Sequence, residues 1–150
     1  MPTDTISAKD LTISAPRSPH VTLGGFAILA RTIDKCRAAI AGTIGEYHFD
    51  CPLDNQLFGF KDIKGTDFKD YVAEASGHSD EEITAWVTSH GQPKTDAEIA
   101  EWTKQVTANN YADQPDKKGW LEGENTRLGL PKDGTLFDYL DADDKASFKK

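Results

Sequence analysis

The chain has 150 residues, the usual size of a single domain, and this length allows a hydrophobic core without stabilising disulfides or metals. Its 25 acidic and 17 basic residues give a formal net charge of -8, so we expect no nucleic-acid partner, because the long-range field would repel one. Residues 76–150 contain 15 acidic and 9 basic side chains, so the first half of the chain is where an anion would dock.

The N-terminal segment, residues 1–23, predicts an extended arm. It contains "SAPRSPH", in which Pro16 and Pro19 disfavour a regular helix. It has neither a basic leader nor an apolar signal core, and the longest apolar run, "FAILA", is far shorter than the ~20 residues of a membrane span. We therefore expect a cytoplasmic protein with no membrane partner, in which Cys36 and Cys51 are free thiols.

The next segment, residues 24–108, predicts a helical core that begins with a helix over residues 26–40. Apolar residues recur there every three or four positions, which is the pattern of one face of an amphipathic helix. Gly42 follows as a stop signal. The apolar residues are Phe26, Leu29, Ile33, Cys36 and Ile40.

Further helices are indicated by their start signals. Pro52 suits a first helical residue and predicts a short helix that ends near Phe60. Another helical run begins at Thr66. The segments "SDEE" and "TDAE", which start at Ser79 and Thr95, are capping boxes and predict two more helix starts.

Residues 109–150 predict a linker and a C-terminal helical segment. The linker is the turn-rich "NNYADQPDKKG" (109–119), and "TLFDYLDADDKASF" (135–148) is the last run compatible with a helix. Together these patterns predict an all-α protein, a single small domain of about five helices with an extended arm. We expect its three tryptophans to lie in the core.

Candidate functional residues begin in the first helix, where a seam of alanines is interrupted by Asp34. Small residues allow a ligand to approach closely, and a buried carboxylate needs a partner, for which Arg31 and Arg37 are within reach. This pattern favours a pocket for an anionic or polar ligand, in which Asp34 orients an arginine. The alternative is an exposed alanine face that favours helix, with Asp34 in a surface ion pair.

The segment "EYHFDC" (46–51) supplies a second group of candidates. Tyr47, His48 and Asp50 are titratable groups that cluster with Asp34, so acid–base catalysis without a cofactor would depend on these four residues. His48 precedes Cys51 by three residues, but in an extended segment their side chains point to opposite faces, which disfavours a thiol nucleophile.

Metal binding is not indicated by this segment. Structural zinc sites usually contain paired ligands such as C-x2-C, a spacing that is missing here, so we expect no metal. The metal-ligand residue types considered are Cys36, His48, Asp50 and Cys51. The other histidines, His20, His78 and His90, are isolated in the sequence, and we assign them no role.

Five segments resemble a bacterial family that is catalogued only as a domain of unknown function. They are "PRSP" (16–19), "LGG" (23–25), "ARTIDKCRA" (30–38), "AGTIGEY" (41–47) and "CPLD" (51–54). The resemblance covers roughly residues 10–107 and implies a small, mainly helical cytosolic protein with no established activity. Family members have "LGGY" and "LPR" where this chain has Phe26 and Ala30. The signature residues are mostly charged, namely Arg17, Arg31, Asp34, Lys35, Arg37, Glu46, Tyr47 and Asp54.

Two functional hypotheses follow. In the first, a small anionic or polar molecule binds between the first helix, the "PRSP" arm and "EYHFDC", and any enzyme would be a cofactor-independent hydrolase or lyase. The ligand-binding residues would be Arg17, Arg31, Lys35 and Arg37. The second is a protein-interaction module whose acidic C-terminal third meets a basic partner. A concave pocket lined by Arg31, Asp34 and Tyr47 would favour the first, and a flat surface with these side chains in internal ion pairs the second.

Overall fold

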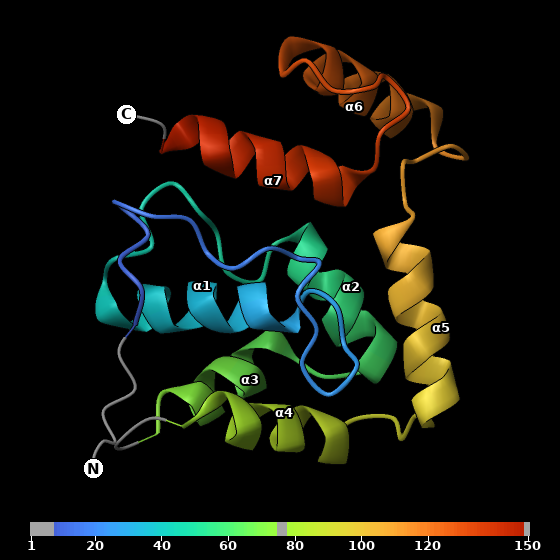
Figure 1. Ribbon diagram of the computed structural model, residues 1–150. Helices are drawn as coiled ribbons and strands as arrows, with labels where there is room; N and C mark the ends of the chain where they lie inside the picture. The colour runs from blue at the N-terminus through green and yellow to red at the C-terminus, as the bar shows by residue number, and fades with distance from the viewer. Residues whose placement is uncertain (1–7, 75–77, 149–150) are drawn as a thin grey trace.

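The computed structural model describes residues 8–74 and 78–148, and within these ranges the protein is all helical (Figure 1). The seven helices of the described chain are α1 (Leu29–Ala41), α2 (Pro52–Lys61), α3 (Gly65–Val72), α4 (Asp80–Ser89), α5 (Asp96–Thr107), α6 (Pro115–Arg127) and α7 (Leu136–Ser147). The expected fold class is therefore confirmed, whereas the expected number of about five helices was too low. Among the described residues, no helix combines the length and the apolar character that a membrane span requires.

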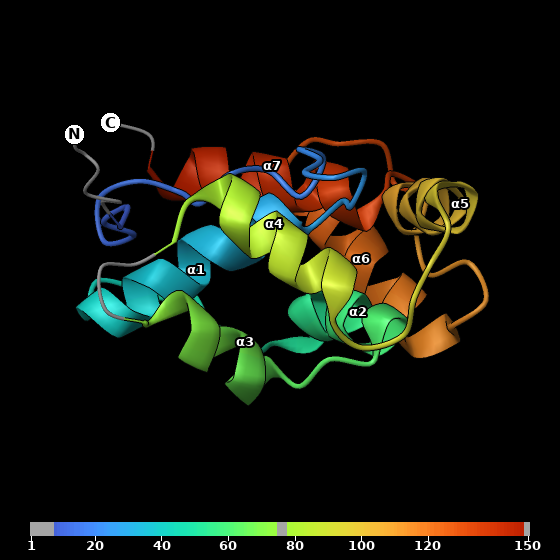
Figure 2. The ribbon, with the colours of Figure 1, turned by 90° about the horizontal axis from the view of Figure 1, so that it is seen from below.

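Helix α1 lies at the centre of the molecule. It packs against α2, α3 and α4, while α6 packs against α7. Figures 1 and 2 show α3 and α4 on one side of α1 and the α6–α7 pair on the opposite side. The described part of the arm and the residues that follow it, 8–28, contain no helix and run along α1 on the side of α7.

Because neighbours surround α1, most of its surface is buried. Every residue from Leu29 to Cys36 is at most 4% exposed, including the charged ones. Both the apolar stripe and the alanine seam of the sequence therefore contribute to the interior. Ile40 is an exception at 43% exposure, because the last turn of α1 extends beyond the core. Gly42 ends the helix in the left-handed conformation, as predicted.

The helix starts predicted at Pro52, Ser79 and Thr95 are confirmed, whereas α3 begins at Gly65, one residue before the predicted Thr66. The hydroxyl oxygens of Ser79 and Thr95 accept hydrogen bonds from the backbone N–H groups of Glu82 and Glu98, each at 3.1 Å. Both capping boxes are complete, because each glutamate side chain accepts from the backbone N–H of its cap residue. Pro52 is the first residue of α2, also as predicted.

Helix α6 is the element that the sequence did not predict. Its first turn overlaps the expected linker 109–119, and Pro115 occupies the first helical position. Gly119 and Gly123 lie in the helix, and both weaken its intrinsic helical tendency. Only two of its residues are buried, Leu121 and Asn125, so the helix needs few apolar residues and its sequence shows little apolar periodicity.

The three tryptophans differ in their packing. Trp102 stacks on Phe60 with ring centroids 4.8 Å apart, and Trp86 stacks on Tyr71 at 5.3 Å, so both extend the core as partly buried residues. Trp120 is 50% exposed, and the expectation that it lies in the core is wrong.

A buried lysine joins α2 to the end of α4. Lys61 is 1% exposed, and its Nζ donates hydrogen bonds to the carbonyl oxygens of Thr88, at 3.2 Å, and Gln92, at 2.6 Å. A cation suits this position, because the carbonyl groups at a helix C-terminus carry partial negative charge. Gly91 passes so close to Lys61 that a Cβ at position 91 would overlap the Lys61 carbonyl oxygen.

We therefore predict that Gly91→Ala destabilises the protein by about 1–3 kcal/mol, because the new methyl group meets backbone and the residue has φ +68°. The matched control is Gly123→Ala in α6, where a Cβ would meet nothing within 4 Å. That control should stabilise the protein by about 0.5–1 kcal/mol. Urea denaturation measures both, and equal midpoints for the two variants would contradict the close approach at Gly91.

Candidate functional site

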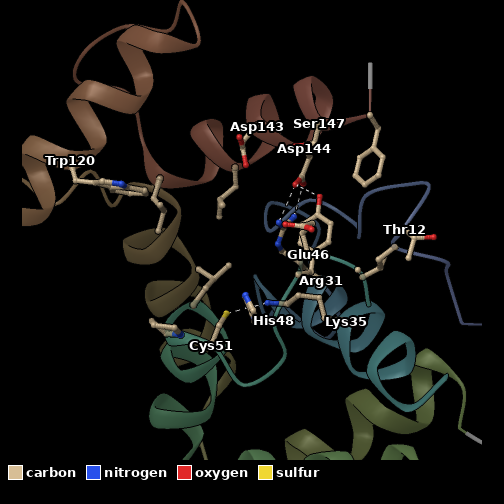
Figure 3. Close-up of a pocket in the computed structure, with 18 of the residues that line it drawn as sticks. Thr12, Arg31, Lys35, Glu46, His48, Cys51, Trp120, Asp143, Asp144 and Ser147 are labelled. Carbon is tan, nitrogen blue, oxygen red and sulfur yellow. Dashed lines mark hydrogen bonds and ion pairs between the residues drawn. The ribbon is translucent and has the colours of Figure 1, made fainter. Parts of the chain in front are cut away.

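A cavity of about 690 Å³ lies beside α1, between the arm, the loop that precedes α2, and α7 (Figure 3). Its apolar wall includes Leu11, Leu53, Trp120, Leu136, Leu140 and Phe148. Its polar side chains are Thr12, Arg31, Lys35, Glu46, Tyr47, His48, Cys51, Asp143, Asp144 and Ser147. The cavity therefore combines an apolar wall with a polar one.

A buried ion pair connects α1 to α7 at this cavity. Arg31 Nη1 and Nη2 donate to the two carboxylate oxygens of Asp144, at 2.7 and 3.3 Å. The Tyr47 hydroxyl donates to Asp144 Oδ1 at 2.7 Å, and burial together with this hydrogen bond raises the pKa of Tyr47 well above its usual range. Arg31 also lies over the Tyr47 ring, 5.6 Å from its centroid. Asp144 thus fixes the α7 side of the cavity.

A second buried pair connects α1 to α2. Lys35 Nζ lies 3.0 Å from Asp54 Oδ1 and 3.2 Å from Cys51 Sγ. Asp54 is fully buried and also accepts hydrogen bonds from the Thr32 hydroxyl, at 2.7 Å, and from the backbone N–H of Asp50, at 2.8 Å. The carboxylate therefore neutralises Lys35, and the Cys51 thiol remains at the cavity.

A turn in the loop brings His48 and Cys51 to the same cavity. The sequence predicted an extended segment with these side chains on opposite faces, but Asp50 has φ 63° and reverses the local direction of the chain. The expected geometry is therefore wrong. The Asp50 carboxylate itself faces α3, since a Cβ on Gly65, the first residue of α3, would lie 2.6 Å from it. A helix N-terminus is a favourable place for a carboxylate.

Asp34 belongs to a different charge network. It is 4% exposed and accepts hydrogen bonds from Arg17 through the backbone N at 2.8 Å, Nε at 3.1 Å and Nη2 at 3.1 Å. Arg17 Nη1 continues to Asp80 Oδ2 at 2.8 Å, and Arg37 Nη1 donates to Asp80 Oδ1 at 3.0 Å. Asp34 is buried and paired with arginine, but the partner is Arg17 of the arm, and the expected pairing with Arg31 or Arg37 is wrong.

Only half of the site residues predicted from the sequence line the cavity. Those that line the cavity are Arg31, Lys35, Tyr47 and His48. Those that lie outside its lining are Arg17, Asp34, Arg37 and Asp50. The structure agrees with neither hypothesis completely. The cavity is concave, as the ligand-binding hypothesis requires, but Asp34 does not line it. Arg31 is already in an internal ion pair, as the interaction hypothesis requires.

Asp144 is the main site residue that the sequence analysis missed. A signal for it exists in the C-terminal run, where Leu136, Leu140, Asp144 and Phe148 recur every four residues along α7. A carboxylate within such an apolar stripe faces the interior and needs a cation, by the same argument that applies to Asp34.

The two cysteines are both free thiols with different surroundings. Cys36 is fully buried, and burial raises the pKa of its thiol to about 12. Cys51 is partly exposed at the cavity. Within the described part of the chain, these thiols do not join His48 and Asp50 in a group arranged to bind a metal.

These features define a single small all-helical domain, built around a buried helix that carries charged side chains, with an amphipathic cavity beside it. The model of a family described as a domain of unknown function, DUF5069, matches residues 13–146, and the chain belongs to this family. The matched range continues past residue 107 and includes α6 and almost all of α7. No curated protein gives a significant match to the chain.

The Arg17–Asp34 pair leads to a stability prediction. Asp34→Asn replaces an acceptor of three hydrogen bonds by a neutral amide and leaves Arg17 without this counter-ion. We expect a loss of about 2–3 kcal/mol, below the ~3–5 kcal/mol of a fully buried pair, because Arg17 keeps partial contact with water. Asp113→Asn, in an exposed turn, is the control and should change stability by less than ~0.5 kcal/mol. Similar urea midpoints for the two variants would rule out a structural role for Asp34.

Asp80 leads to a pH prediction. Burial acts to raise the pKa of Asp80, but hydrogen bonds and charge from Arg17 and Arg37 outweigh it and lower the pKa below its usual value. Since the pKa is lower in the folded state than in the unfolded chain, this stabilisation is complete above the unfolded value of ~3.9 and disappears as the pH falls through the folded value. The loss of stability between neutral pH and pH ~2.5 should therefore be smaller in Asp80→Asn than in the wild type. Denaturation midpoints at the two pH values test this, with Asp113→Asn as a control that should retain the wild-type loss.

Proposed function

We propose that the protein binds a small amphipathic molecule in the cavity beside α1. The observation that carries this proposal is the combination of volume and lining. About 690 Å³ falls in the range of ~300–1,000 Å³ that is typical of ligand pockets. The apolar part of the ligand would contact Leu136 and Leu140 of α7, and the polar part would contact the loop before α2.

The charge balance of the lining supports a polar ligand that is neutral or positively charged. The carboxylates of Glu46, Asp143 and Asp144 outnumber the cations of Arg31 and Lys35. Both cations are also neutralised already, by Asp144 and by Asp54. An anion would have to compete with these buried carboxylates, which makes the expected anionic ligand the less favourable choice.

Cofactor-free acid–base catalysis is an extension of this proposal. Of the expected acid–base residues, His48 lines the cavity, and histidine is the side chain that most often serves as a general acid or base. Tyr47 also lines the cavity, but its proton is donated to Asp144, so it would act mainly in positioning. If the bound molecule is transformed, His48 is the residue to which we assign the proton transfer.

A protein-interaction module is the alternative, and it has less support. The internal pairing of Arg17, Asp34 and Arg37 explains part of the charged signature as attachment of the arm to α1 and α4, as that hypothesis requires. It gives no role to the cavity, which the ligand-binding proposal explains directly.

The cysteines provide a direct test. Iodoacetamide should alkylate Cys51 in the native protein, whereas Cys36 should stay unmodified, because it is buried and its raised pKa of about 12 leaves little thiolate. We expect a compound that raises the melting temperature in a screen of neutral, cationic and anionic metabolites to slow alkylation of Cys51, measured by mass spectrometry. Cys36 serves as an internal control for unfolding.

Two tryptophan substitutions locate the binding site. Ser147→Trp would fill part of the cavity and should weaken binding of such a compound by at least ~10-fold, while Ala146→Trp, at the neighbouring exposed position outside the lining, should leave it unchanged. If no compound protects Cys51, or if both variants bind equally well, the proposed site is wrong.

A further inference from the structure

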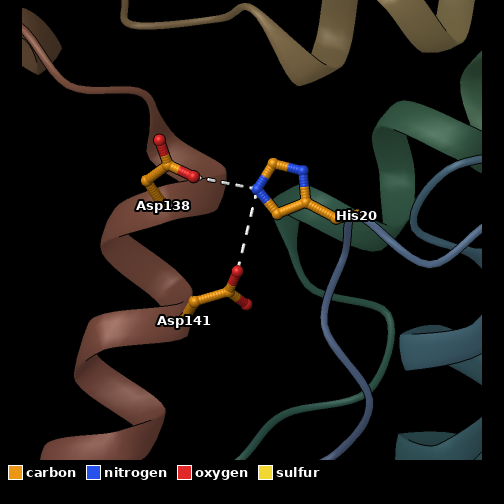
Figure 4. Close-up of side chains that lie close together, drawn as sticks. All are labelled: His20, Asp138 and Asp141. Atoms are coloured by element: carbon orange, nitrogen blue, oxygen red, sulfur yellow. Dashed lines mark hydrogen bonds and ion pairs between the residues drawn. The ribbon is translucent and has the colours of Figure 1, made fainter.

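A histidine and two aspartates meet on the outer side of the contact between the arm and α7. His20 Nε2 lies 3.0 Å from Asp138 Oδ1 and 3.7 Å from Asp141 Oδ2 (Figure 4). Asp138 and Asp141 are separated by one turn of α7, so the helix presents both carboxylates on the same side. Since His20 is 118 residues away from Asp138 in the sequence, only the fold brings the three together.

The charges of this group are unbalanced. Both carboxylates approach the same ring nitrogen, and an imidazole has at most one N–H at Nε2, which can point well at only one of them. Within the described residues, neither carboxylate forms an ion pair with a lysine or an arginine. Two negative charges therefore face a single nitrogen, which is the arrangement that a divalent cation would neutralise.

We propose that His20, Asp138 and Asp141 bind a divalent transition-metal ion, for which Zn²⁺ is the representative. One imidazole nitrogen and two carboxylate oxygens are ligand types that suit Zn²⁺. The three ligand atoms lie within 4.8 Å of one another. Bonds of ~2.1 Å at ordinary coordination angles separate ligand atoms by about 3.0–3.4 Å, so small side-chain rotations complete the site. Three protein ligands leave a position open for water or a ligand.

Neighbouring residues orient the ligands. The His20 and Phe137 rings pack in a T-shaped arrangement, with centroids 5.3 Å apart and planes at 90°. The backbone N–H of Asp138 donates to the Thr135 hydroxyl at 3.2 Å, which fixes the first turn of α7. A bound ion would fasten the arm to α7. The three ligands are not in the lining of the cavity, so this site is independent of the proposed function.

Isothermal titration calorimetry with Zn²⁺ tests the proposal on the reduced 150-residue chain. We expect a site in the wild type whose affinity falls at least ~10-fold in His20→Ala and in Asp141→Asn. The control is His90→Ala, which removes an exposed histidine at the end of α4 and should bind Zn²⁺ as the wild type does. The substituted side chains are partly exposed, and circular dichroism would verify that each variant is folded.

Thermal unfolding gives a second readout. Zn²⁺ should raise the melting temperature of the wild type and of His90→Ala, and have a smaller effect on the His20 and Asp141 variants. Absence of Zn²⁺ binding to the wild type would overturn the proposal, and the group would then serve only as a polar contact between the arm and α7. Binding that persists unchanged in His20→Ala would also overturn it, because the ion would then occupy another place, such as the Cys51 thiol.

Discussion

The structure depends on the neutralisation of charged side chains on a helix that is buried on nearly all sides. Arg31, Asp34 and Lys35 are each at most 4% exposed, and an unpaired charge in such a place is very costly. Arg31 pairs with Asp144 of α7, and Asp34 pairs with Arg17 of the arm. Lys35 pairs with Asp54 of α2, and Arg37, nearer the surface, pairs with Asp80 of α4. Displacing any of these elements would leave a charge of α1 without its partner, so the pairs favour one arrangement around α1.

This constraint also determines the character of the cavity. Arg31 and Lys35 lie at its polar wall, but their charges are already neutralised by Asp144 and Asp54. The wall is therefore polar without being strongly basic. A ligand would be selected largely by the shape of the cavity and by contact with the apolar surface of α7. His48 and Cys51 differ from these residues, because the turn at Asp50 presents them to the cavity from the loop.

Membership of DUF5069 covers residues 13–146, which includes both the arm and α7. The physical roles of the charged signature explain why these distant parts belong to one unit. Arg17 connects the arm to α1 and α4, and Asp144 connects α7 to α1. A segment that ended before α7 would leave Arg31 buried without its carboxylate, so the C-terminal helices are part of the same domain in energetic terms.

The sequence by itself determined most of the helices, because caps and stops act over a few residues. Ser79, Thr95, Pro52 and Gly42 were sufficient to place helix ends, whereas α6 escaped prediction because its glycines and exposed surface give little local signal. The alanine seam left two alternatives for Asp34, a buried carboxylate or a surface ion pair, and the structure shows it buried. Only the tertiary structure decided which cation would pair with it, since Arg31 and Arg37 were close in sequence but other carboxylates attract them. Pairing over such separations depends on how the helices pack, and no local pattern contains that information.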